Sequence, residues 1–285
     1  MSNIVVDTDT YLSMILSLTK LSPVTIFSGI LLIFARVVPL LILVPFLGAK
    51  TVPRVARLLF AGCLTIILLP NIIVHMKQDI IISMFFVGLM IKEAAIGFIL
   101  GFLAAIPFII AQSSGSLIDH IRGSSSLQIT DPTTQTQTGP VGILYNYVLI
   151  AVFFAIGGPF LFFDALSSSF TIIPVDHLIN PTFFNIKLPF WQMAIGLINQ
   201  ILTIAIQLGA PSIIGILMAE MFLGIANRLA PQVQIVFLGI SLKSWVGLGV
   251  LAAAWYFIIN QLGKESLEWM KMIERTIQQM SPPGG

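Results

Sequence analysis

The sequence predicts an all-α, polytopic, membrane-associated protein, and three observations carry that prediction. Only 9% of the 285 residues are Asp, Glu, Lys or Arg, whereas soluble domains carry about 25%. Hydrophobic residues make up 57% of the chain, and its mean hydropathy is +1.00. The apolar residues also gather in long runs without charges. Too few polar residues remain to cover a water-soluble globule of this size, which excludes an ordinary cytosolic enzyme.

About six long hydrophobic segments are expected, each near or above the roughly 20 residues that cross a bilayer as a helix. They are residues 24–47, 58–76, 94–118, 132–163, 188–219 and 244–263. Two of these segments are long enough to hold a broken helix or a hairpin. A β-barrel is rejected because its strands are about 10 residues long and alternate strictly, whereas these runs are longer and apolar on every side.

Polar connections separate the segments at residues 48–57, 112–140 and 173–187. The middle connection is the longest, and a loop of this length in a membrane protein is usually functional or disordered. It is rich in Ser, Thr, Gln and Gly, and as a whole it is a poor helix former. Part of it is therefore expected to be a loop.

The two ends of the chain differ in character. Asp7 and Asp9 stand where a secretory signal would have Lys or Arg, so the amino terminus is interpreted as mature sequence. From Lys264 onward, charged and apolar residues recur at helical spacing and predict an amphipathic helix. The expected organisation is one helical domain over residues 1–262, followed by this helix and a short tail over residues 263–285.

The loop charges do not orient the chain in a membrane. If all six segments crossed, the loops of one side would carry six Lys and Arg residues and those of the other side five. The positive-inside bias is usually clearer. Two explanations stay open: the segmentation is wrong, or some helices do not cross a lipid bilayer in the usual way. The formal net charge of +2 provides no basic patch for nucleic acid.

Six ionisable residues interrupt the apolar runs, three of each sign: Arg36, Lys92, Glu93, Asp164, Glu220 and Lys243. Because charges at membrane depth are costly, they are usually paired or face an aqueous path. One interpretation makes them a proton or ion relay. The favoured interpretation makes them ion pairs that hold helices or subunits together. Lys92 and Glu93 are adjacent, so they are expected to point to different sides of a helix and to need separate partners.

Two further patterns predict contacts between helices or subunits. Gly97, Gly101 and Ala105 recur at i, i+4 and i+8, which lets another backbone approach closely. Gln200 and Gln207 share one face of an otherwise apolar helix. They need polar partners, either other helices or water in a channel, and the pattern does not choose between the two.

No catalytic residue, cofactor site or metal site is expected. His75, His120 and His177 are isolated and lack the spacing of a metal-binding motif. Asp119 beside His120 is rejected as an acid/base pair, because neighbours in sequence seldom face each other. Glycine-rich phosphate-binding loops are absent from the sequence. Any energy used would come from another subunit or from the proton gradient.

An ordered set of short stretches runs from about residue 24 to residue 243. It comprises RVVP from Arg36, PFLG from Pro45, PRVAR from Pro53, Lys92-Glu93 with Gly97 and Gly101, GSLID from Gly115, Arg122-Gly123, Asp131-Pro132, Gly157-Gly158, Ala210-Pro211-Ser212 and LGIANRLAPQV from Leu223. Together these stretches resemble the FliR/SctT export-gate proteins of bacterial flagella and type III secretion injectisomes. The last stretch carries the most weight.

The resemblance implies a non-enzymatic, multi-pass subunit of the bacterial inner membrane, within the basal body of a secretion system. Family members join FliP/SctR-like and FliQ/SctS-like gate subunits in an assembly around the channel for unfolded exported proteins. A FlhB/SctU-like switch protein wraps the channel entrance. Much of the assembly stands out of the bilayer plane, which would account for the undecided loop charges. Residues 119–123, Asp131 and the Gln/Thr-rich run resemble the injectisome branch more than the flagellar one.

The resemblance also nominates a plug for the closed channel, beside the connection that follows the third segment. Gly and Ser next to apolar residues can close a pore and move aside, because Gly costs little to re-bend. The plug candidates are Phe108, Ile109, Ile110, Gln112, Ser113, Ser114 and Gly115. The candidates for helix or subunit contacts are Arg36, Lys92, Glu93, Gly97, Gly101, Asp164, Gln200, Gln207, Glu220, Arg228 and Lys243.

The expected function is that of a core subunit of the export channel, closed at rest and opened by its substrate. The alternative is a small-solute secondary transporter that uses Asp164, Glu220 or Lys92 in coupling. A transporter should act alone or as a homo-oligomer, and it should lose transport when one such residue is neutralised. An export subunit should be inert without its partners.

Overall fold

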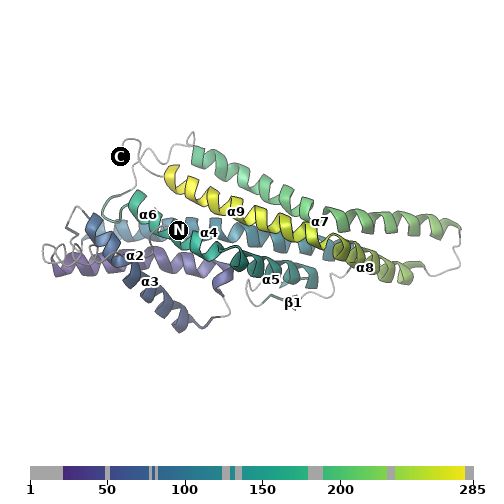
Figure 1. The fold of residues 1–285 in the computed structure, drawn as a ribbon, viewed down its shortest axis with the longest axis horizontal. Helices are drawn as coiled ribbons and strands as arrows, with labels where there is room; N and C mark the ends of the chain where they lie inside the picture. Colours follow the sequence, from purple (N-terminus) through teal and green to yellow (C-terminus); the bar gives the residue numbers. More distant parts are fainter. Residues whose placement is uncertain are drawn as a thin grey trace. The chain divides into compact units, whose positions relative to one another are not determined.

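The computed structural model describes residues 22–48, 52–76, 79–80, 83–123, 129–131, 137–178, 189–229 and 235–279. The regular secondary structure in these residues is helical apart from one short pair of antiparallel strands (Figure 1). Asp7 and Asp9, the end of the last matching stretch at residues 230–233, and the tail from residue 280 lie outside the described residues.

Among the described residues, four single helices are long and apolar enough to cross a membrane. They are α2 (Pro23–Leu43), α3 (Arg54–His75), α4 (Met84–Ile121) and α7 (Pro189–Leu229). A single 3-10 turn, η1 (Pro45–Leu47), follows α2. The Oγ of Ser22 caps α2 by accepting from the N–H of Thr25 at 3.2 Å, and Pro23 occupies the first turn, where its fixed φ suits a helix.

Two further spans are possible as bent helix pairs. The pair of α5 (Pro140–Ala155) and α6 (Gly158–Ile172) is bent by 74°. The pair of α8 (Ile235–Ala253) and α9 (Trp255–Gln279) is bent by 64°. Four candidate spans, or six with the bent pairs, confirm the predicted all-helical membrane architecture with broken segments.

Several boundaries differ from the prediction. Helix α4 begins at Met84 rather than at residue 94, and it continues to Ile121 through residues expected to form the polar connection. The segment at residues 188–219 is one unbroken helix despite Pro211. The second break falls at Ala254 instead, inside the predicted segment 244–263. Charge-free runs therefore locate the helices but not their ends.

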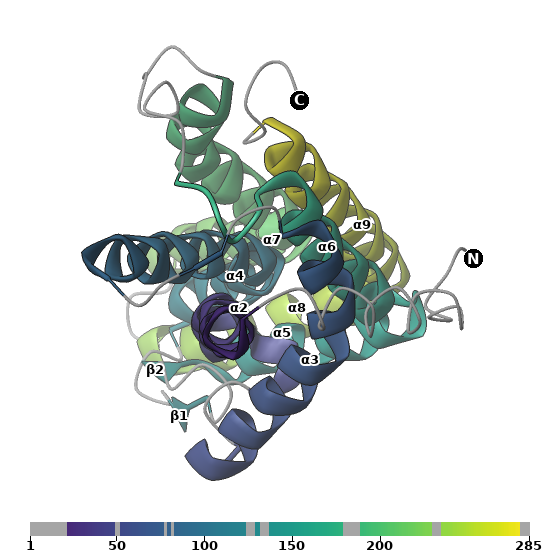
Figure 2. The same cartoon turned by 90° about the vertical axis from the view of Figure 1, so that its left-hand side faces the viewer.

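The chain packs as two compact units. Unit 1 comprises Met1–Ala105, Phe160–Gln192 and Met270–Gly285, and unit 2 comprises Ile106–Pro159 and Met193–Trp269. In unit 1, α2 packs against α3 and against the first part of α4 (Figures 1 and 2). The rings of Phe46 and Phe162 meet edge to face there, with centroids 5.2 Å apart.

Unit 2 contains the only hairpin that the described residues form. Strands β1 (Ile129–Thr130) and β2 (Gln137–Thr138) pair antiparallel, with Ile129 opposite Thr138 (Figure 2). Helix α5 starts directly after β2 and ends before Gly157, whose φ of 78° lies in the left-handed region that glycine tolerates. This glycine sits where α5 gives way to α6.

Close approach of α4 to α2 in unit 1 depends on two glycines. A Cβ at Gly97 would fall on the carbonyl oxygen of Arg36. A Cβ at Gly101 would lie 2.9 Å from the Cα of Leu40. The i, i+4 spacing of these glycines thus matches two successive turns of α2.

We expect Gly97→Ala to destabilise the protein by about 1–3 kcal/mol, because the added methyl group meets backbone that cannot yield cheaply. Thermal unfolding of the detergent-solubilised chain measures the effect. Gly62→Ala on α3 is the matched control, since its Cβ would meet no atom within 4 Å. The control should melt at or above the wild-type temperature, because Ala favours a helix over Gly. Equal melting of both variants would contradict the close α2–α4 contact.

Candidate functional site

A buried ion-pair network in unit 1 joins α2, α4 and the end of α6. Nε of Arg36 donates to Oε2 of Glu93 at 2.5 Å, and Nη2 donates to Oε1 at 3.0 Å. Nη1 donates to the carbonyl oxygen of Ser169 and Nη2 to that of Ile173, both at 2.8 Å. The guanidinium carbon lies 4.0 Å from the centroid of the Phe170 ring. Every nitrogen of this guanidinium therefore has an acceptor, as a buried cation requires.

Lys92 belongs to the same network. Its Nζ lies 2.6 Å from Oε1 of Glu93 and donates to the carbonyl oxygens of Pro174 at 2.7 Å and His177 at 2.9 Å. The prediction that Lys92 and Glu93 need separate partners was wrong. The flexible lysine stem lets the ammonium turn back to the neighbouring carboxylate. A second buried carboxylate, Asp176, lies in the turn that supplies these carbonyls.

The geometry of this network suits a fixed support. The side chains of Arg36 and Glu93 are 0% exposed. A proton relay would need a group that meets an aqueous path, whereas these charges are held by hydrogen bonds on all sides. We refer to Arg36, Lys92 and Glu93 below as the Arg36 network.

In unit 2, Asp119 near the end of α4 caps the start of α5. Its Oδ2 accepts from the backbone N–H of Val141 at 2.9 Å and of Gly142 at 3.2 Å. Its Oδ1 accepts from Nε of Arg122 at 3.0 Å and from Nη2 at 2.6 Å. The N-cap residue of α5 is Gly139, which has no side chain to cap the helix. The Asp119 carboxylate supplies that cap, with the charge that a helix amino terminus favours.

A second buried carboxylate, Asp131, ties α4 to α5 beside the hairpin. Its Oδ2 accepts from Nε2 of Gln112 at 3.1 Å and from Nδ2 of Asn146 at 3.0 Å. The hydroxyls of Ser116 and Thr138 share a hydrogen bond of 2.5 Å. These contacts explain why the polar end of α4 remains helical: its side chains find partners in the hairpin and α5. We call this set of side chains, with Asp119, the hairpin cluster.

The plug candidates lie inside α4 and not in a loop. Phe108, Ile110, Gln112, Ser114 and Gly115 are buried in unit 2. Residues 112–115, which the prediction also counted in the polar connection, are therefore helical, and the contacts of the hairpin cluster are made from this part of α4. Two candidates are less buried: Ile109, which is 37% exposed, and Ser113.

Packing around the plug candidates is close but leaves polar atoms unsatisfied. A Cβ at Gly115 would lie 2.6 Å from the backbone N of Gly142, so α4 and α5 touch there. The hydroxyls of Ser114, Tyr145 and Ser212 are buried, and none has a hydrogen-bond partner among the described residues. Buried polar groups without partners are costly, and each calls for an explanation.

The other contact candidates lie at more exposed positions. Glu220 of α7 and Lys243 of α8 form a partly exposed ion pair, with Nζ 2.6 Å from Oε1. Asp164 of α6 is exposed and makes no ion pair with a residue that the structure describes. The remaining exposed candidates are Gln200, Gln207 and Arg228. Each of these could bind a group from outside the chain.

An apolar ridge runs along the exposed side of α7. Met221 is 71% and Leu229 81% exposed, and the ridge comprises Met218, Met221, Phe222, Ile225 and Leu229. These positions recur at helical spacing and share one face. In a membrane protein such a face is covered by lipid or by another helix. We call it the α7 ridge.

The sequence nominated Glu93 as a contact residue, but it did not nominate the other acidic residues of these clusters. Asp119 and Asp131 entered through the stretches that carry the family resemblance, and Asp119 also as a rejected partner of His120. Asp176 and Asn146 were not singled out. The i, i+3 spacing of Asp119 and Arg122 was a usable signal. His120 is exposed, and its Nδ1 lies 2.9 Å from the carbonyl oxygen of Ser116.

Comparison with known proteins gives one consistent result. The family of bacterial export proteins, family 1, matches residues 27–268. The flagellar biosynthetic protein FliR of Bacillus subtilis is 27% identical over 253 residues, which cover 88% of this chain and 96% of that relative. The Yop proteins translocation protein T of Yersinia pestis is 33% identical over 172 residues, which cover 60% and 62%. The secretion system apparatus protein SsaT of Salmonella typhimurium is 28% identical over 239 residues, which cover 82% and 89%.

We expect Glu93→Gln to lower the free energy of unfolding by about 3–5 kcal/mol, because it leaves two buried cations without their carboxylate. Thermal unfolding and the amount of protein in the membrane measure this effect. Glu220→Gln is the matched control, since it breaks an exposed pair worth at most about 1 kcal/mol. Similar losses in the two variants would show that the Arg36 network has no special structural role.

Proposed function

This chain belongs to the FliR/SctT family of bacterial export proteins, and we propose that it forms part of the gated channel through which unfolded proteins cross the inner membrane. Family membership makes it a non-catalytic, multi-span membrane component of a flagellar or type III secretion export apparatus. The observation that carries the channel proposal is the segment of α4 from Phe108 to Gly115. It combines close packing with the buried hydroxyl of Ser114, which has no hydrogen-bond partner among the described residues.

The gate in this proposal is the plug segment of α4, and the hairpin cluster is its latch. Gln112 and Asn146 hold Asp131, while Asp119 holds the start of α5. Hydrogen bonds to charged groups contribute about 1.5–3 kcal/mol each, so the closed arrangement is held by several kcal/mol. The unsatisfied hydroxyls of Ser114 and Ser212 lower the stability of that arrangement. This balance favours a segment that is closed at rest yet able to move.

The partners in this proposal are FliP/SctR-like and FliQ/SctS-like gate subunits and a FlhB/SctU-like switch protein. The α7 ridge supports subunit contact, because Met and Phe side chains are enriched where proteins meet. Gln200 and Gln207 on exposed positions of the same helix offer hydrogen bonds to a neighbouring helix. In a complex, the side-chain amides of Gln200 and Gln207 would find their hydrogen-bond partners on the neighbouring subunit.

A small-solute transporter is not supported. The chain belongs to a family of export proteins, and Lys92, one of the residues considered for coupling, is fixed in the Arg36 network. The branch of the family is a separate matter. The flagellar relative and the secretion-system relatives match at comparable identity, so the preference for the injectisome branch stays a prediction.

We expect the α7 ridge to lie against a gate subunit. The test places a cysteine in the ridge by Met221→Cys, in a chain whose one native cysteine is removed by Cys63→Ala. A bifunctional thiol or photoactivatable reagent is applied to native membranes, and the tagged chain is purified in mild detergent. Mass spectrometry should identify a FliP/SctR-like or FliQ/SctS-like protein in the adduct, and accompanying needle or flagellar components would identify the branch.

The matched control keeps the exposed Cys63 on α3 as its one reactive site. Recovery of a lone chain or a homodimer, under conditions that preserve other membrane complexes, would overturn the export-channel proposal. Equal adducts from Cys63 and from position 221 would show that the ridge is not a specific contact.

We expect Gln112→Leu to raise ion leakage through the assembled complex, because it removes a donor from Asp131 and weakens the latch. Leakage is recorded with a potential-sensitive dye in cells that carry the whole apparatus. Asn260→Leu is the control, since it makes a similar polar-to-apolar change at an exposed position of α9, outside the plug segment and the hairpin cluster. Unchanged leakage in an assembled Gln112→Leu complex, or equal leakage in the control, would contradict the latch.

A further inference from the structure

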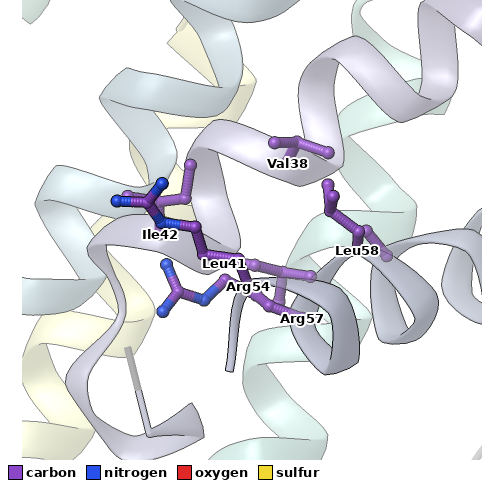
Figure 3. Close-up of a pocket in the computed structure, with 7 residues that line it drawn as sticks. Val38, Leu41, Ile42, Arg54, Arg57 and Leu58 are labelled. Atoms are coloured by element: carbon purple, nitrogen blue, oxygen red, sulfur yellow. The ribbon is translucent and has the colours of Figure 1, made fainter. Parts of the chain in front are cut away.

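A groove in unit 1 lies between the carboxyl-terminal half of α2 and the first turns of α3 (Figure 3). Its volume is about 220 Å³. The apolar lining comes from Val38, Leu41 and Ile42 of α2 and from Leu58 and Ala61 of α3. Arg54 and Arg57 of α3 complete the lining, and no acidic residue is among the lining side chains. An apolar trough that ends in two cations matches an amphiphile with an anionic head.

The start of α3 concentrates positive charge without an internal counter-charge. The helix begins at Arg54, its first turn contains no acidic residue, and its N-cap, Pro53, makes no side-chain hydrogen bond. Arg57 follows one turn later. The amino end of a helix carries partial positive charge from its free N–H groups, so two cations there are unfavourable unless an anion binds.

The arginine side chains are only partly satisfied. Nη2 of Arg57 donates to the carbonyl oxygen of Val52 at 3.1 Å. Nε of Arg57 is buried and has no hydrogen-bond partner in the described part of the chain. Arg54 is exposed and forms no ion pair with any described residue. In Figure 3 both guanidinium groups reach the side of the groove where Ile42 lies.

The groove opens beside an apolar surface of α3. This helix is a candidate membrane span and is largely exposed, with Val55 at 69%, Leu59 at 67% and Ile66 at 69%. Arginines at the end of such a span lie at the depth of lipid headgroups. The apolar trough then continues from the headgroup level toward the acyl chains.

We propose that this groove binds an anionic phospholipid. The phosphate lies between Arg54 and Arg57 at the start of α3, where planar guanidinium groups and free N–H groups match phosphate geometry. One acyl chain lies along Val38, Ile42 and Leu58. A carboxylate from a partner subunit would meet the charges but leave the trough uncovered, which favours the lipid. Basic pockets between membrane helices bind lipid headgroups by the same chemistry.

The test measures lipid retention by the full-length chain reconstituted in phosphatidylcholine bilayers that contain a minor fraction of phosphatidylglycerol. Native mass spectrometry of the released protein counts the bound lipids. We expect the wild type to retain phosphatidylglycerol in preference to phosphatidylcholine. In the double variant Arg54→Gln with Arg57→Gln, the amount of bound phosphatidylglycerol should fall at least about tenfold, because both headgroup contacts are lost.

Two further variants separate the lipid site from general charge and from misfolding. Lys264→Gln with Lys271→Gln removes two exposed cations of α9 and should leave retention unchanged. Ile42→Gln keeps both arginines but puts an amide in the trough at a position that is 43% exposed. It should lower phosphatidylglycerol retention while the melting temperature stays near that of the wild type, so the proposal remains testable if the arginine variant does not accumulate.

Three outcomes would overturn the proposal. The first is equal phosphatidylglycerol retention by the wild type and the double arginine variant. The second is displacement of phosphatidylglycerol by inorganic phosphate, which would make the groove a simple anion site. The third is loss of the lipid from the purified export complex together with a cross-link from Arg57→Cys to an acidic segment of a partner subunit, which would assign the arginines to a protein contact.

Discussion

Burying a carboxylate in an apolar helix costs several kcal/mol of folding free energy unless cations or hydrogen-bond donors bind it. The packing of unit 1 follows from the groups that bind Glu93. Arg36 reaches Glu93 from α2, and Lys92 reaches it from α4, the helix that carries Glu93 itself. Both cations also bind carbonyl oxygens at the end of α6 and in the turn after it. One buried charge thereby fixes three segments that are far apart in sequence. The absence of a side chain at Gly97 is the steric condition, since α2 must lie against α4 for Arg36 to reach Glu93.

Unit 2 also contains buried carboxylates, and one of them binds the free N–H groups at a helix terminus. Asp119 satisfies the free N–H groups at the start of α5, which glycine at the N-cap cannot do. Asp131 collects donors from α4 and α5. The difference from unit 1 is that Asp131 is held by the neutral amides of Gln112 and Asn146, and Asp119 in part by backbone N–H groups. Breaking a contact with a neutral donor leaves one charge without that donor, whereas separating Arg36 from Glu93 leaves two buried charges unpaired. Contacts of the first kind fit a segment that moves better than a fixed support.

The sequence predicted the class of fold and the approximate course of each helix, because long charge-free runs can only be satisfied as helices in lipid. It did not predict the ends of α4. The start was missed because Lys92 and Glu93 interrupt the apolar run, and their neutralisation by each other and by Arg36 depends on tertiary structure. The far end was missed because Ser and Gly are poor helix formers on their own. The partners of Gln112 and Ser116 lie 19 and 22 residues further along the chain, so the sequence does not show the contacts.

The distribution of polar and apolar surface in this chain also bears on its stability. Buried polar groups serve contacts within each unit, whereas α3 and α7 turn large apolar side chains outward. Such faces are stable only when lipid or another subunit covers them. Ligands and subunits that bind the folded chain raise its stability by mass action, so its folding free energy belongs to the assembly and to the surrounding lipid. We infer that a loop-charge rule derived from helices that cross a bilayer alone has little force for such a chain, which would account for the undecided count of Lys and Arg in its loops.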